Sequence, residues 1–197
     1  MPSNFTTIVI CAITAISGCR DAWPPLVLGP PTHFKLALKG SYGVGIELEL
    51  RVPTGYFERA DPYSWSWDRG ADDPKIYVSN DPEDRWTTLE NPCRGKGTRP
   101  TLMQSRVELP DGAITTCETV DGKTIIGYDV YRIMRSIETE IECHVSFGRH
   151  EYDPVRGDPS PERRSLAMAI CNSLRVVGRS EYDLNIDVMQ RGLGNPN

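Results

Sequence analysis

The chain has 197 residues, 39% of them hydrophobic and 25% charged, which suits one folded domain and excludes wholesale disorder. The 22 Lys and Arg residues against 27 Asp and Glu give a net charge of -5, which disfavours a nucleic-acid binder because phosphate neutralisation would need a local basic surface. The 17 Gly and 16 Pro residues favour turn-rich β structure over a helical bundle.

An apolar segment opens the chain. Residues 1–19 carry no charged side chain, and the run from Phe5 to Ile16 is interrupted only by Thr. About a dozen apolar residues is too short to span a bilayer, which needs ~20, but it matches the hydrophobic region of a secretory signal. The sequence therefore predicts export.

Ile16-Ser17-Gly18-Cys19 follows this segment and resembles the lipobox of bacterial lipoproteins, in which an aliphatic and two small residues precede the acylated cysteine. The resemblance implies a signal peptide over residues 1–18 and acyl chains such as palmitate on Cys19. Arg20 after the cysteine favours the outer membrane over retention in the inner one, so the domain would lie in the periplasm. An ordinary cleaved signal and a buried N-terminal strand are the alternatives.

Four cysteines remain once Cys11 is removed with the signal and Cys19 is lipidated, and an even number in an exported domain predicts two disulfides. Apolar alternation from Ile137 to Phe147 places Cys143 on the core side of a strand. Helical periodicity turns Cys171 toward the same layer. We therefore predict the pairs Cys143–Cys171 and Cys93–Cys117.

The rest of the chain is predicted in order along the sequence. Residues 19–32 are rich in proline and predict an extended tether, residues 33–191 a single globular domain, and residues 192–197 a disordered tail. Strands are predicted over residues 33–38, 46–52, 75–79, 106–109, 114–120, 123–134 and 137–147. Asp121-Gly122 predicts a tight hairpin turn, and residues from 178 onward predict either a last strand or a mobile segment.

A single amphipathic helix is predicted over residues 161–174. Ser160 is a suitable N-cap and Pro161 suits the first helical position. Leu166, Ile170 and Leu174 recur every four residues and mark the buried stripe. The predicted fold class is α+β, an antiparallel sheet covered on one face by this late helix and held by two disulfides.

Two short motifs resemble secreted proteins of the Mog1/PsbP-like class. They are Val52-Pro53-Thr54-Gly55-Tyr56, where a strand enters a turn, and Ser173-Leu174-Arg175 at the end of the helix. The likeness spans residues 44–177. It implies a fold, and a class in which binding roles are commoner than catalytic ones.

Two groups of residues are candidates for partner binding. Tyr63, Trp65 and Trp67 alternate, so an extended chain places them on one face, either as an exposed row that holds a glycan or a protein, or as part of the core. The acidic group comprises Asp72, Asp73, Asp81, Glu83 and Asp84. Its spacing does not match a calcium loop, which favours a solvated acidic surface over a metal site.

No recognised catalytic motif occurs in the sequence. The segments around Lys96 and Lys123 lack the glycine spacing of a phosphate loop, and the Gly-x-Ser-x-Gly of serine hydrolases is missing. His33, His144 and His150 are scattered, and His144 and His150 are interpreted as surface decoration. We expect no cofactor, no metal and no enzymatic activity, with a hydrolase built from scattered carboxylates as the remaining enzymatic alternative.

The resulting hypothesis is a non-enzymatic, exported, lipid-anchored binding protein with a protein partner. Its most concrete form is an immunity protein that neutralises a secreted antibacterial effector in the periplasm. Acidic charge would steer a basic partner to it. The alternative is an envelope-maintenance lipoprotein that binds cell-wall glycan through Tyr63, Trp65 and Trp67.

Overall fold

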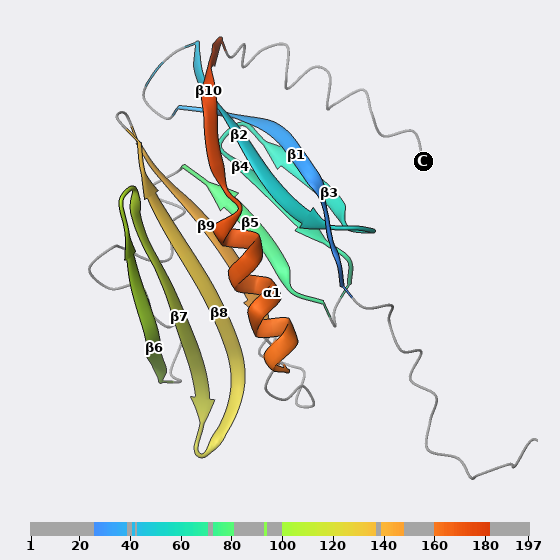
Figure 1. Cartoon of the computed structure of the whole chain (residues 1–197), viewed down its shortest axis with the longest axis vertical. Coiled ribbons are helices and arrows are strands. Elements are labelled where there is room, and N and C mark those ends of the chain that lie inside the picture. The colour runs from blue at the N-terminus through green and yellow to red at the C-terminus, as the bar shows by residue number, and fades with distance from the viewer. Residues whose placement is uncertain are drawn as a thin grey trace, which may run out of the picture.

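The computed structural model of the chain describes residues 26–38, 41, 43–70, 73–80, 93, 100–136, 139–147 and 160–181. These residues form ten strands and one helix (Figure 1). The elements are β1 (Leu28–Ala37), β2 (Val44–Pro53), β3 (Phe57–Asp61), β4 (Ser64–Asp68), β5 (Lys75–Ser79), β6 (Thr101–Leu109), β7 (Gly112–Asp121), β8 (Thr124–Arg135), β9 (Glu140–Phe147), α1 (Pro161–Asn172) and β10 (Arg175–Glu181).

The strands make two antiparallel sheets. The larger has seven strands in the order β3-β4-β5-β9-β8-β7-β6, and the smaller has three in the order β1-β2-β10. The larger sheet consists of two meanders, β3-β4-β5 and β6-β7-β8-β9, which meet only where β9 pairs with β5. The described part of the chain is therefore mostly antiparallel β-sheet with one helix, which agrees with the predicted architecture at this coarse level.

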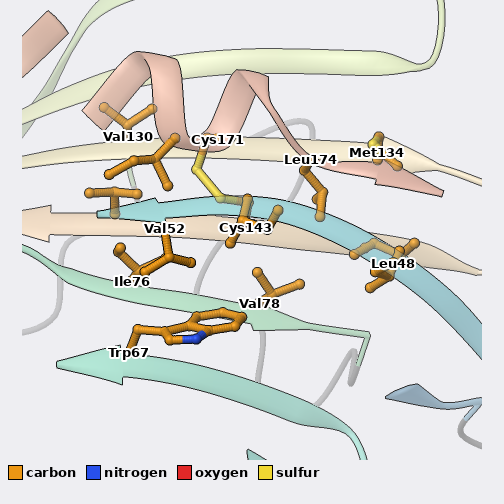
Figure 2. Packing of buried hydrophobic residues seen from close by; sticks show 14 of the residues in the cluster. Leu48, Val52, Trp67, Ile76, Val78, Val130, Met134, Cys143, Cys171 and Leu174 are labelled. Atoms are coloured by element: carbon orange, nitrogen blue, oxygen red, sulfur yellow. A yellow bond between two sulfur atoms is a disulfide. The ribbon is translucent and has the colours of Figure 1, made fainter. Parts of the chain in front are cut away.

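The core lies between the larger sheet and a second layer made of α1 and the smaller sheet (Figure 2). Alternation along each strand decides which side chains enter it. On β9, Ile141, Cys143 and Val145 face the core, whereas Glu142 and His144 point to the opposite side, which we call the outer face of the larger sheet. The helix α1 contributes Ala167, Ile170 and Cys171 to the core from the second layer.

The helix is fixed at both ends by side chains. Ser160 accepts a hydrogen bond from the Arg163 N–H at 3.4 Å, as the predicted N-cap requires. At the other end, Arg132 of β8 donates through Nη1 to the carbonyls of Cys171, Asn172 and Leu174 at 3.0–3.1 Å. Cys171 and Asn172 belong to the last turn of α1, where carbonyls lack an intrahelical N–H, and Leu174 follows directly after it. Arg175 donates to the same carbonyls of Asn172 and Leu174, at 2.7 and 2.9 Å.

Arg132 also reaches the β6–β7 turn, where its Nη2 lies 2.8 Å from Oδ2 of Asp111. Its side chain is 4% exposed. Burial lowers the pKa of this guanidinium, and Asp111 opposes that effect. Arg132 therefore joins the end of α1 to the far margin of the larger sheet.

Two glycines make the hairpin turns on either side of β7. Gly122 has a φ of 61°, as the predicted Asp121-Gly122 turn requires. Gly112 has a φ of 149°, and a Cβ built there would lie 1.9 Å from the carbonyl oxygen of Ile133. No other residue fits at position 112 without moving β8.

The structure differs from the sequence prediction at several places. β1 begins at Leu28, inside the predicted tether, because an edge strand accepts Pro30 and Pro31 where a central one would not. β3 and β4 were not predicted as strands. The smaller sheet is a second layer that the single-sheet prediction lacked. A last strand was expected from residue 178 onward, whereas β10 begins at Arg175 and ends at Glu181. The rest of that predicted segment, residues 182–197, lies outside the described part.

Among the described residues no helix is long and apolar enough to cross a membrane, since α1 has 12 residues. The predicted signal peptide and Cys19 lie outside the described residues.

Candidate functional site

The aromatic row is largely part of the core. Trp67 is 3% exposed, and its ring centroid lies 5.2 Å from that of Phe34 on β1. Trp65 is half-buried against the same Phe34, and its Nε1 donates to the carbonyl of Lys35 at 3.0 Å. Tyr63 lies in the turn before β4. This face therefore joins β4 to β1, and Trp67 is not accessible to a glycan or a protein partner.

The acidic group does not form a solvated surface at Asp73. Its side chain is 1% exposed and forms ion pairs with Arg69 (3.4 Å) and with Arg163 of α1 (3.6 Å). The prediction that Asp73 binds a partner is therefore wrong. Its carboxylate is buried between two arginines of the same chain and is not accessible to a partner. Asp72, Asp81, Glu83 and Asp84 lie outside the described residues.

Both predicted disulfides are present. Cys143 of β9 bonds to Cys171 of α1, and both residues are fully buried in the core (Figure 2). Cys93 bonds to Cys117 of β7 on the outer face. The second bond attaches the connection between β5 and β6 to the larger sheet.

A polar cluster beside Cys117 on the outer face was not predicted. Nε2 of His144 lies 2.9 Å from Oδ1 of Asp129 on β8, and the imidazole stacks on the ring of Tyr131 with centroids 4.3 Å apart. In the strand register Tyr131 is opposite His144, and Asp129 is opposite Cys117. His144 is therefore a partly buried member of a hydrogen-bonded cluster, not surface decoration. The pairing of β8 with β9 could have indicated this, because its register puts Asp129 and His144 on the same face of the sheet. His150 lies outside the described residues.

One hydrogen bond and one ring stack hold this cluster together. No three His, Cys, Asp or Glu side chains gather to hold a metal ion in the part of the chain that the structure describes. Burial raises the pKa of Tyr131 above the ordinary tyrosine value of 10.0, and Asp129 and Glu142 add to the shift because they repel a phenolate.

The Tyr131→Phe variant is expected to change stability at alkaline pH. The folded state keeps this phenol neutral at pH values where the unfolded chain ionises. The resulting stabilisation is therefore complete below pH 10 and falls by about 1.4 kcal/mol per pH unit above it. Urea unfolding at pH 9, 10 and 11 should therefore show a free energy of unfolding that falls less steeply with pH in the variant than in the wild type.

Tyr56 provides the matched comparison. Burial raises the pKa of Tyr56, and the charge of Asp73 adds to the effect. Tyr56→Phe should therefore reduce the alkaline loss of unfolding free energy by a similar amount. The double variant should show the sum of the two reductions. An alkaline slope in Tyr131→Phe equal to that of the wild type would show that the buried phenol does not contribute.

Of the two edge strands of the larger sheet, β6 has more exposed large apolar side chains, three against one on β3. It pairs with β7 on one side, and no other described strand pairs with it. Leu102, Met103 and Val107 are 50%, 56% and 48% exposed. Every residue from Leu102 to Glu108 is exposed, and Figure 1 shows β6 along one side of the molecule. We call this the free edge of β6.

A long apolar edge strand is a template for pairing with another chain, and proteins usually shorten, charge or cover such strands. The free edge of β6 is nine residues long and bears a single oppositely charged pair, Arg106 and Glu108, whose Nε and Oε1 atoms are 2.5 Å apart. A shallow open pocket beside the β6–β7 turn is lined in part by the same two residues. The sequence predicted only residues 106–109 of this strand.

No family model matches the chain, and neither does any curated protein.

Proposed function

We propose that this protein is an exported, lipid-anchored binding protein that works by pairing the free edge of β6 with a strand of another protein chain. The observation that carries the proposal is the exposure of β6 together with its apolar side chains. Strand addition supplies affinity through backbone hydrogen bonds, and exposed side chains such as Val107 and Met103 supply specificity.

Export is supported by the two disulfides, since such bonds persist in oxidising compartments. The anchor rests on Cys19 and its lipobox. Two acyl chains at ~0.8 kcal/mol per buried methylene would hold a domain of this size firmly on a membrane. In its most specific form the partner chain belongs to a secreted antibacterial effector, and the acidic net charge would favour a basic one.

The test places a photo-crosslinking amino acid at position 107 on β6 or at position 177 on β10. The full chain is expressed in a bacterium that has an outer membrane. Val177 is the matched control because it is similarly exposed, at 49%, in a different strand. We expect a discrete adduct at 107 only, in the membrane fraction and with both disulfides intact. The adduct is identified by mass and the pair is then purified.

Met103→Lys combined with Val107→Lys should weaken that purified pair by roughly tenfold or more, because charges on an edge strand oppose strand addition. Both positions are exposed, so stability should change little. Equal adducts at 107 and 177, or an affinity unchanged by the two lysines, would refute binding at β6. Reduced protein found only in the cytosol would refute export.

A further inference from the structure

The half of β6 nearest its turn is free of irregularity. The register with β7 shifts between Met103 and Ser105, and from Ser105 to Leu109 the pairing is regular. A further strand can add only where the backbone is regular, because a bulge leaves a residue unpaired and bends the strand. The part of the free edge suited to pairing is therefore the segment Ser105–Leu109.

This segment is self-complementary in charge about its central residue. Arg106 and Glu108 stand on either side of Val107, and their ion pair shows that both side chains lie on the same face of the strand. If an identical strand pairs with it antiparallel about a two-fold axis at Val107, then Arg106 lies opposite the partner's Glu108, and Glu108 opposite the partner's Arg106. Side chains in such positions are close enough to interact directly.

The same arrangement covers apolar surface on the other face. Val107 is 48% exposed and would lie directly opposite the partner's Val107. One two-fold axis thus matches two ion pairs and one apolar pair, which is the self-complementarity that a symmetric dimer interface requires.

We propose that the free edge of β6 binds a second copy of this chain, antiparallel and in the register that places Val107 on the two-fold axis. This rests on the proposed use of β6 for binding and names the chain that occupies the edge while no foreign strand is bound. The dimer joins two seven-stranded sheets into one continuous sheet, covers both β6 strands and leaves the two β3 strands as its edges. A foreign strand must displace the second copy.

The test is a charge exchange measured by sedimentation equilibrium of the full chain in detergent. Arg106→Glu puts two acidic side chains opposite two others, and Glu108→Arg does the same with basic ones, so each variant alone should dimerise roughly tenfold more weakly than the wild type. A mixture of the two variants restores both opposite-charge pairs, and it should form a heterodimer as tight as the wild-type dimer.

Glu58→Arg and Arg59→Glu on the other edge strand, β3, are the matched controls, since both residues are exposed and lie outside the proposed interface. Each should dimerise like the wild type. Failure of the mixture to associate would overturn the proposed register, and so would equal weakening by the β3 controls.

Cysteine cross-linking tests the register without changing charge. Val107→Cys should form an intermolecular disulfide, since directly opposed Cα atoms lie within the range of such bonds. Leu102→Cys should not, since it is far from its own copy in this register. Cross-linking at 102 and not at 107 would overturn the inference.

The two proposals fail separately. Wild-type protein that stays monomeric at all concentrations, with a foreign adduct at position 107, removes the dimer and leaves strand binding at β6 standing. A dimer with the predicted charge behaviour and no foreign adduct supports this inference and confines the function of β6 to self-association.

Discussion

Replacing Arg132 with Met is expected to lower the free energy of unfolding by about 3 kcal/mol, because a buried hydrogen bond to a charged group contributes roughly 1.5–3 kcal/mol and Arg132 makes several. Its Nη1 serves three carbonyls at the end of α1. Asp111 contributes less to the loss, because its side chain is 43% exposed and water replaces the guanidinium there. Urea unfolding of the two proteins measures the difference.

Two further variants separate charge from geometry. Arg132→Lys keeps the charge, but one ammonium cannot reach both the three carbonyls and Asp111, so most of the loss should remain. Arg135→Met removes an exposed ion pair with Glu140 and should cost less than about 0.5 kcal/mol. If Arg132→Met were as stable as Arg135→Met, the buried guanidinium would not be holding the helix end.

Replacing Cys143 and Cys171 together with Ala should cost about 3.5 kcal/mol from loop closure alone, in the chain-entropy model, for the 28-residue separation between them. A cavity cost adds to this, because both residues are fully buried in the core. Thermal and urea unfolding of the double variant at neutral pH measure the sum.

The other disulfide is the internal control. Cys93 and Cys117 are separated by 24 residues, so the closure contribution is nearly the same. Replacing that pair with Ala should cost less, because Cys93 is only partly buried on the outer face. Equal losses for the two double variants would mean that the contact between β9 and α1 adds nothing beyond chain closure.

Local patterns predicted the elements that depend on neighbours in sequence. Alternation around Leu48, the Asp121-Gly122 turn and the Ser160 cap each specify structure within a few residues, and the structure has all three. The cysteine pairing was predicted because two such patterns, on β9 and α1, each aim one cysteine at the core. Long-range geometry was needed only to confirm that the two meet.

Features that depend on distant pairing could not be predicted. Asp73 is buried because Arg163, on α1, reaches it, and nothing near Asp73 in the sequence indicates that. The smaller sheet has a third strand because β10 pairs with β2, and Trp67 is core because β1 supplies Phe34. The free edge of β6 is likewise a property of strand order, since a strand's own sequence does not show whether it has one neighbour or two.

The position of β9 between β5 and β8 has a consequence for how the chain folds while it is being made from the N-terminus onward. The β3-β4-β5 and β6-β7-β8 units can each form early, but they have no common partner until Glu140–Phe147 has been delivered. Closing that long connection is slow compared with making a hairpin. Until then the two units share no strand, so the larger sheet can be completed only after β9 has been made.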